Sequence, residues 1–202
     1  MDTQMKDYSL GAGLIDDRLN RHHDLFLAAV DVKEKKLLDV GCGQGLFLKT
    51  VRDRGAQVLG IDPDPVNVRN CESHGVRVLR GEFDKSTDLH GFKPDIVTIF
   101  EVIEHVYDPH PLIEAARQFN CPVYVSTPNG FNLMRAVKFL TTQTHHDGHM
   151  DPVHNRDAQH IRAFSHRMVE ELLAMHGFTS IKRITPKPLA RYLEQVILIE
   201  AR

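Results

Sequence analysis

The sequence predicts an α/β fold in which a doubly wound, mostly parallel seven-stranded sheet carries helices on both faces and ends in an antiparallel hairpin at one edge. Over residues 36–140, short apolar runs of strand length alternate with segments of helical period, which is typical of parallel sheets with crossover helices. The last two strand-like segments, 178–184 and 192–201, are expected to pair antiparallel at one edge. The chain has no internal repeat and no low-complexity segment, so 1–202 is expected to form a single domain.

Composition narrows the class of protein. Of the 202 residues, 42% are hydrophobic and 26% are charged, which suits one globular domain with a full core. The formal net charge is -2, so the sequence does not indicate a general binder of polyanions such as nucleic acid. There is no apolar run long enough to cross a bilayer, so no membrane insertion is expected.

The chain also carries signals about its compartment. Its N-terminus is polar and acidic, which argues against a signal peptide. Cys42, Cys71 and Cys121 are isolated, with no C-x-x-C pattern, which indicates reduced thiols in a cytosolic protein. A cytoplasmic location is therefore expected.

The most informative stretch joins a buried strand to a helix through a glycine loop. Lys36–Val40 is a short apolar run, and it stops at Gly41, Gly43 and Gly45, three glycines on alternate positions. A helical pattern then runs from Leu46 to Gly55. Because glycine accepts positive φ and lets a ligand approach the backbone, this stretch predicts the entry of a nucleotide-type site.

The chemistry of this loop excludes two common phosphate sites. Its G-x-G-x-G spacing differs from the G-x-G-x-x-G of the dinucleotide fingerprint and from a phosphate loop ending in Gly-Lys-Ser/Thr. The loop contains no Lys or Arg to meet phosphate charge. Asp39, just before the loop, fits the ammonium group of an amino acid better than a pyrophosphate.

The remaining helices and strands are predicted from hydrophobic periodicity and from the residues that cap or end them. Ser165 is expected to cap a late helix that ends at Gly177. Residues 141–160 are polar, His-rich and aperiodic, and they predict a loop that faces the substrate. The expected helices are 14–30, 65–74, 110–119, 131–140 and 168–176, and the further expected strands are 57–62, 75–80, 94–100 and 123–127.

Asp62 ends the second strand, about twenty residues beyond the glycine loop, where a doubly wound fold places an acid that binds ribose hydroxyls. A carboxylate can accept two hydrogen bonds from a vicinal diol. The alternative is a helix N-cap, because Pro63 and a helix from about Pro65 follow. The spacing favours the ribose role.

Four motifs in register resemble the class I S-adenosylmethionine-dependent methyltransferases. Residues 38–45, Leu-Asp-Val-Gly-Cys-Gly-x-Gly, are similar to motif I of that family, and Gly-Ile-Asp at 60–62 is similar to its acidic second strand end. Residues 95–106 resemble its fourth strand and the helix that follows, and Ser-Thr-Pro-Asn at 126–129 resembles the end of its fifth strand. The resemblance spans roughly residues 36–200 in the family's order.

The resemblance implies a Rossmann-like fold, S-adenosyl-L-methionine as cofactor and a set of cofactor-binding residues. Glu82 or its neighbouring backbone could meet the adenine amino group, and Phe83 could pack on the ring, although a plain turn accounts for both equally well. Phe100 and Glu101, at the end of the central strand, are expected to face the methionine end. The cofactor-binding set is Asp39, Gly41, Cys42, Gly43, Gly45, Asp62, Pro63, Glu82, Phe83, Phe100 and Glu101.

The catalytic candidates lie directly after the fourth strand. On a helix, Glu101, Glu104 and His105 would share one face and could bind Mg²⁺ or Mn²⁺. This pattern is similar to the metal site of the small-RNA 3′-terminal 2′-O-methyltransferases, and that resemblance makes His160 the fourth ligand. The chain also resembles the ubiquinone-biosynthesis O-methyltransferases and many small-molecule relatives, more closely than it resembles the small-RNA enzymes. His105 as a base without metal, with Glu101 beside it, remains an alternative, as does local capping by the glutamates.

Two segments flank the expected site. Residues 1–30 form an N-terminal helix that in methyltransferases of this type often covers the cofactor. Tyr8, Arg18, His22 and His23 could then reach it, although a solvated helix face is the favoured interpretation of each. Residues 131–164 form a substrate-side insertion, and a solvated loop is favoured for most of its histidines, among them His145, His146, His149 and His154.

The sequence therefore predicts an O-methyltransferase that acts on a small molecule. Near-neutral charge and the lack of a basic stretch argue against nucleic acid as a partner. One alternative is a metal-dependent RNA 3′-terminal 2′-O-methyltransferase, and a non-enzymatic alternative is a cofactor-binding regulatory domain. No feature of the sequence indicates an oligomeric state.

Overall fold

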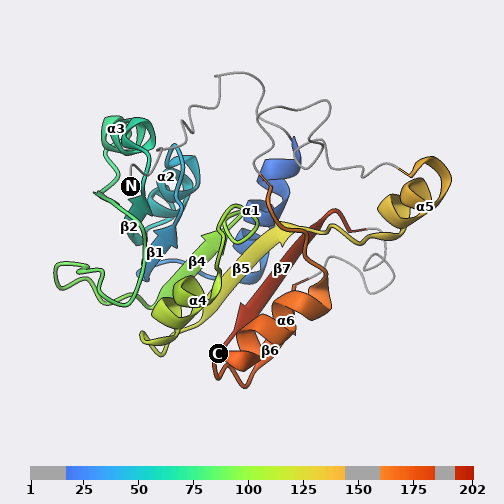
Figure 1. Cartoon of the computed structure of the whole chain (residues 1–202). Helices are drawn as coiled ribbons and strands as arrows, with labels where there is room; N and C mark the ends of the chain where they lie inside the picture. The colour runs from blue at the N-terminus through green and yellow to red at the C-terminus, as the bar shows by residue number, and fades with distance from the viewer. Residues whose placement is uncertain (1–16, 144–159, 185–193) are drawn as a thin grey trace, which may run out of the picture.

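A computed structural model describes residues 17–143, 160–184 and 194–202, and the strands in these ranges form one sheet. The sheet has seven strands in the order β3-β2-β1-β4-β5-β7-β6 (Figure 1). The strands are β1 Lys36–Val40, β2 Gln57–Asp62, β3 Val78–Arg80, β4 Ile96–Phe100, β5 Val123–Pro128, β6 Ile181–Arg183 and β7 Val196–Ala201. The predicted mixed sheet of doubly wound type is confirmed.

Helices cover both faces of the sheet. The buried residues of α4 and α6 belong to one hydrophobic cluster, and those of α1, α2 and α3 belong to a second cluster on the opposite face. Figure 1 shows α4 and α6 in front of the sheet and α1 behind it. The helices are α1 Asp17–Ala29, α2 Leu46–Asp53, α3 Pro65–Ser73, α4 His110–Arg117, α5 Leu133–Thr142 and α6 His166–Met175.

The strand order places a ligand edge at the middle of the sheet. β1 pairs in parallel with β2 on one side and with β4 on the other, so the direction in which the chain adds strands reverses at β1. In open α/β sheets, ligands bind outside the carboxyl ends of the strands at such a reversal. The ends of β1, β2, β4 and β5 therefore define the edge at which a site is expected.

The C-terminal strands close the far side of the sheet. β7 pairs antiparallel with both β5 and β6, which confirms the predicted antiparallel hairpin. Pro128 lies opposite Val196, so the beginning of β7 reaches the same edge as the end of β5. The hairpin connection at 185–193 lies outside the described residues.

The chain between β4 and α4 corrects one prediction. The helix expected directly after the fourth strand, within residues 101–106, is absent: residues 101–109 form turns and bends, and α4 begins only at His110. Glu101 has a φ of 56°, a left-handed conformation that turns the chain away from the strand. His105 N–H then donates to the Val102 carbonyl oxygen at 2.9 Å, which closes a tight turn. Glu101, Glu104 and His105 therefore lie in turns and not on one face of a helix.

The inserted segment forms the helix expected after β5. Its N-cap is Asn132, whose side chain accepts a hydrogen bond from Arg135 N–H at 2.9 Å. α5 buries none of its residues and extends away from the sheet (Figure 1). Residues 144–159, including His145, His146, His149 and His154, lie outside the described residues, as do residues 1–16 with Tyr8.

The first helix is anchored by an aromatic cluster on one face of the sheet. Phe26 is fully buried, and its ring lies 4.9 Å from Tyr124 and 5.6 Å from Phe100, centroid to centroid. These edge-to-face contacts fix α1 across the strands β4, β5 and β7. None of the helices described is both long and apolar enough to cross a bilayer.

We expect Phe26→Ala to lower the free energy of unfolding by about 3–5 kcal/mol, because it leaves a cavity beneath α1. Urea denaturation measures the loss. The matched control is Leu140→Ala on α5, a side chain that is 80% exposed and should change stability by less than about 0.5 kcal/mol. Equal losses in the two variants would contradict this packing of α1.

Candidate active site

The glycine loop is held against the end of β2. Gly41 and Cys42 both donate their backbone N–H to the Ile61 carbonyl oxygen, at 2.8 Å and 3.1 Å. Gly41, Gly43 and Gly45 have φ values of 73°, 52° and 77°, which only glycine adopts without strain. Gly45 also forms the N-cap position of α2. The loop thus keeps the left-handed path that its glycines predicted.

The three glycines differ in what surrounds them. A Cβ on Gly41 would lie 2.4 Å from Val102 Cγ2, and one on Gly45 would lie 2.7 Å from Cys71 Sγ. A Cβ on Gly43 would meet no atom within 4 Å. Gly41 and Gly45 are therefore required by packing, whereas the space beside Gly43 is open to a ligand.

Asp62 is tied into the loop by its carboxylate. One oxygen accepts from Gly43 N–H at 2.8 Å, and the other accepts from Asp64 N–H at 2.9 Å and from Asn67 Nδ2 at 3.1 Å. The cap of α3 is Asp64, not Asp62, because Asp64 accepts from Val66 N–H at 2.7 Å. Burial raises the pKa of Asp62, and these hydrogen bonds oppose the rise. The ribose role of Asp62 stays a prediction.

Asp39 is a buried acid whose main partner is a hydroxyl. Its register partner on β4 is Thr98, and Thr98 Oγ1 donates to Asp39 Oδ1 at 2.6 Å. Burial raises the pKa of Asp39 from 3.8 to about 7, and the charge of Asp62 adds to the rise. The sequence indicated the acid but not Thr98, which sits inside an apolar strand and becomes visible only through the pairing register.

The other predicted cofactor residues occupy different surroundings. The Cys42 side chain is buried 3.7 Å from Cys71 Sγ, and the hydrogen bond that the Cys42 thiol shares with Cys71, together with burial, raises the pKa of Cys42. Pro63 and Glu82 are exposed near the ends of β2 and β3. Phe83 is buried in the hydrophobic core and stacks on Phe119 at 6.3 Å, so its own ring is committed to packing. Contact of these residues with adenine stays a prediction.

Glu101 and Glu104 were predicted to share one face of a helix. That helix is absent, and the two side chains point in different directions. Glu101 Oε1 accepts from Ser126 Oγ at 2.9 Å, whereas Glu104 Oε2 accepts from Thr127 Oγ1 at 2.9 Å. Because Ser126 and Thr127 are consecutive in β5, their side chains point to opposite faces of the sheet. The two glutamates are therefore directed to different sides of the strand end.

Three of the four predicted metal ligands nonetheless come together. Ligand atoms of Glu104, His105 and His160 all lie within 4.8 Å of one another, and Glu101 is not part of this group. The His105 and His160 rings are 4.8 Å apart and nearly perpendicular. Ile161 N–H donates to the Glu104 carbonyl oxygen at 3.0 Å, which fixes the His160 segment beside the turn. Carboxylate and imidazole donors in one group suit a divalent cation or a proton-transfer site.

A second buried polar pair lies at the beginning of β7 and escaped sequence analysis. His166 Nε2 is 3.4 Å from Glu194 Oε2, and both residues are buried. Asn129, also buried, donates through Nδ2 to the Glu194 carbonyl oxygen at 3.0 Å. Nothing in the local sequence pairs these residues, because they meet only when β7 is added beside β5.

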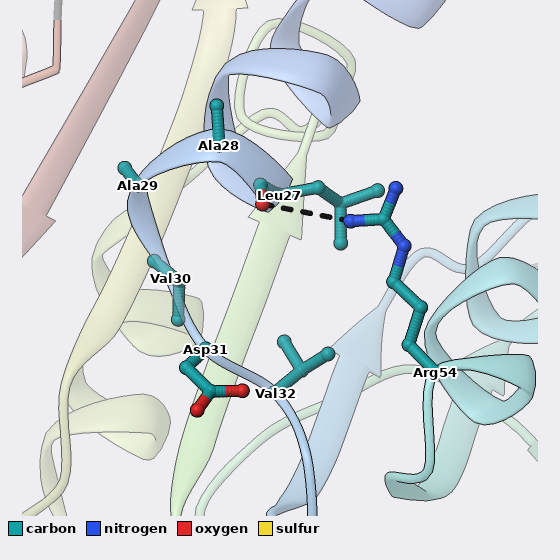
Figure 2. A pocket seen from close by; sticks show the side chains of 7 residues that line it. All are labelled: Leu27, Ala28, Ala29, Val30, Asp31, Val32 and Arg54. Atoms are coloured by element: carbon teal, nitrogen blue, oxygen red, sulfur yellow. Dashed lines mark hydrogen bonds between the residues drawn. The ribbon is translucent and has the colours of Figure 1, made fainter.

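The hollow drawn in Figure 2 is remote from these residues. It measures about 300 Å³ and is bounded by the C-terminal end of α1, the link to β1 and Arg54. Arg54 Nη1 donates to the Leu27 carbonyl oxygen at 3.5 Å across it. It lies at the amino end of β1, opposite the ligand edge, so it is not part of the candidate site.

Comparison with known families decides between the classes of protein that this geometry allows. Residues 13–182 match the family described as a methyltransferase domain. The chain belongs to that family. Membership of the class I S-adenosylmethionine-dependent methyltransferases, predicted from four motifs, is confirmed for this methyltransferase domain.

Curated relatives resemble part of the methyltransferase domain. The ubiquinone biosynthesis O-methyltransferase of Saccharophagus degradans is 37% identical over 107 residues, which cover 48% of this chain and 45% of that protein. The enzyme of the same name from Azorhizobium caulinodans is 35% identical over 133 residues, which cover 62% of this chain and 49% of that protein. The chain spans about half the length of the curated relatives it matches.

Solved structures share the fold at low sequence identity. An S-adenosylmethionine-dependent methyltransferase from Archaeoglobus fulgidus has a TM-score of 0.63 and 20% identity, and the match covers 91% of this chain and 93% of that one. The YcgJ protein from Bacillus subtilis has a TM-score of 0.67 and 14% identity, with 90% and 97% covered. These likenesses support the architecture of the methyltransferase domain.

We predict that Asp39 makes the stability of the ligand-free protein depend on pH. The folded protein keeps this carboxyl protonated up to about pH 7, whereas the unfolded chain ionises it near pH 4. The free energy of unfolding should therefore fall as pH rises between these values and stay low above them. Asp39→Asn cannot ionise, and it should be about 1–3 kcal/mol more stable than the parent at pH 8.

Urea denaturation at about pH 4.5, 6 and 8 measures how the free energy of unfolding changes with pH. Asp31→Asn is the control, because Asp31 is exposed and lies at the opposite edge. A parent slope that persists in Asp39→Asn would show that another group is responsible.

Proposed function

We propose that this methyltransferase domain transfers a methyl group from S-adenosylmethionine to a hydroxyl of a small molecule. The observation that carries the proposal is the glycine loop, with open space beside Gly43 and the acids Asp39 and Asp62 on either side of it. It stands at the point where the strand order reverses. The curated relatives named as O-methyltransferases support the choice of oxygen as acceptor.

The residues present fit the cofactor. Backbone that only glycine can form lets a nucleoside approach, and Asp62, already hydrogen-bonded to the loop, retains acceptor capacity for a ribose hydroxyl. Asp39 offers a buried carboxyl for the ammonium of the amino-acid end, and an adjacent cation would favour its charged form. S-adenosylmethionine supplies an activated methyl group, so the protein needs only to orient it toward the acceptor.

The group formed by Glu104, His105 and His160 is the candidate for activating the acceptor hydroxyl. Glu104 is 1% exposed and accepts a hydrogen bond from Thr127, so its carboxylate is a fixed potential metal ligand beside two partly exposed imidazoles. A divalent cation bound by these three residues would hold two vicinal oxygens and lower the pKa of the attacking hydroxyl. Without a metal, His105 is the base. Either role places acceptor activation at the turn after β4.

A second candidate substrate shares this chemistry. The 3′-terminal ribose of an RNA also presents two vicinal oxygens, and the approach of His160 to Glu104 and His105 is the observation that favours it. The formal net charge of -2 favours a small molecule over RNA, because phosphate backbones require basic surfaces. Catechol and a short RNA, each incubated with S-adenosylmethionine, separate the two candidates by which one is methylated.

We expect Gly43→Ala to fold but to lose cofactor binding and methyl transfer. The added Cβ meets no protein atom, and its positive φ costs about 1–2 kcal/mol, whereas a bound nucleoside would collide with it. Calorimetry with S-adenosylhomocysteine should show at least a tenfold loss of affinity, about 1.4 kcal/mol. Gly91→Ala, with a φ of 79° and equally open surroundings in the parent, should bind normally. Unchanged affinity in Gly43→Ala would remove the loop from the cofactor site.

We expect metal removal to reduce methyl transfer to catechol. Treatment with EDTA should lower turnover, and Mn²⁺ should restore it. His160→Ala should lower turnover at limiting Mn²⁺ by about tenfold or more while S-adenosylhomocysteine affinity changes less than about twofold. His90→Ala, an exposed histidine away from the group, serves as control. Unaltered turnover in EDTA would leave His105 as the base.

A further inference from the structure

One buried histidine of the first helix has no hydrogen-bond partner for its Nδ1 atom. His22 is 2% exposed, and no residue in the described part of the chain hydrogen-bonds to this nitrogen. Sequence analysis favoured a solvated helix face for His22, and that interpretation is wrong. Buried polar atoms in folded proteins are nearly always partnered by protein, water or ligand. The unpartnered nitrogen therefore points to a partner beyond the described residues, such as a bound ligand or water.

The surroundings of His22 place it at the ligand edge. Its ring meets Phe100 edge-on at 5.2 Å, and Phe100 is the last residue of β4. The neighbouring His23 stacks on Phe47 at 4.4 Å, and Phe47 is the second residue of α2, directly beyond the glycine loop. The histidine pair thus bridges the end of β4 and the beginning of α2.

The face of the sheet on which His22 lies indicates which end of a bound cofactor would be nearest to it. Thr98 and Phe100 are two residues apart in β4, so they point to the same face, and Thr98 holds Asp39 there. His22 therefore lies on the face that carries the acid suited to an ammonium group. Glu104 is bound by Thr127, whose side chain points to the opposite face, away from His22.

We propose that His22 Nδ1 hydrogen-bonds to the amino-acid end of the S-adenosyl cofactor and is a positioning residue for it. The proposal rests on the proposed function and names a contact within the same site. The amino-acid end carries an ammonium that donates and a carboxylate that accepts, so a neutral imidazole can satisfy one of its groups.

Electrostatics support this role. Burial lowers the pKa of His22 to about 3, and the charge of His23 adds to the effect, so the imidazole is neutral at physiological pH. Burial likewise lowers the pKa of His23 to about 4. The titratable groups that face His22 from the neighbouring strands include Asp39 and Tyr124, and Glu101 lies beyond Ser126. The two histidines therefore add no positive charge beside a sulfonium-bearing ligand.

The test compares two ligands that differ only at the proposed contact. S-adenosylhomocysteine has the amino-acid end, whereas 5′-methylthioadenosine keeps the nucleoside and sulfur and lacks it. His22→Phe should lower the affinity for S-adenosylhomocysteine by about tenfold or more and change that for 5′-methylthioadenosine by less than about twofold. His22→Gln, whose amide can donate and accept, should recover part of the loss.

A stability readout separates contact from structure. His22→Phe replaces an unpartnered polar ring with an apolar one of similar size, so the ligand-free melting temperature should stay or rise. His74→Phe, at the far end of α3, is the matched control and should bind both ligands normally. In the parent protein, the ¹⁵N resonance of His22 Nδ1 should shift with S-adenosylhomocysteine and not with 5′-methylthioadenosine, which tests the contact without any substitution.

Each outcome has one meaning. If the parent binds S-adenosylhomocysteine and His22→Phe binds it equally well, or if both ligands weaken to the same extent, the contact is overturned. If the His22 resonance responds identically to both ligands, it is overturned as well. If the parent binds neither ligand, the proposed function fails, and the position of His22 is not the cause.

Discussion

The carbonyl oxygen of Ile61 organises the ligand edge. It accepts the N–H groups of Gly41 and Cys42, and the next residue, Asp62, accepts that of Gly43, so the end of β2 dictates the path of the loop after β1. Left-handed backbone at three alternate positions is tolerated because those positions are glycine, and α2 can then begin at Leu46. Gly43 and Asp62, two residues proposed to bind the cofactor, are held in place by this connection between the loop and β2.

Most of the helices and strands could be predicted from the sequence because the signals for them lie within a few consecutive residues. Apolar runs of strand length, glycine loops and caps such as Ser165 act over a few residues, and the elements that they predicted are present in the described ranges. The pairing of Asp39 with Thr98 depends on the register between two distant strands, and the pairing of His166 with Glu194 depends on how α6 packs beside β7. A single sequence displays neither. The burial of His22 was missed for a similar reason, because this helix residue packs against Phe100 on β4, which is distant in the sequence.

The failure at residues 101–109 has a different origin. The helix was expected from the resemblance of residues 95–106 to the family's fourth strand and following helix, and the i, i+3, i+4 spacing of Glu101, Glu104 and His105 is compatible with a helix without requiring one. What decides is the left-handed φ of Glu101, a conformation that the sequence would signal only through glycine or asparagine. The turn nevertheless gathers Glu104, His105 and His160, because Ile161 and Arg162 bind backbone carbonyl oxygens of the same turn.

The packing of α1 against β7 has a consequence for how the domain is made. β7 follows the six other described strands in the chain, and it must enter the sheet between β5 and β6 before the packing beneath Phe26 is complete. During synthesis on the ribosome, the glycine loop and its neighbouring strands can assemble early, whereas α1, which precedes them in the chain, docks only when β7 is available. A nascent chain would therefore display the glycine loop without the packed α1 until β7 has been translated.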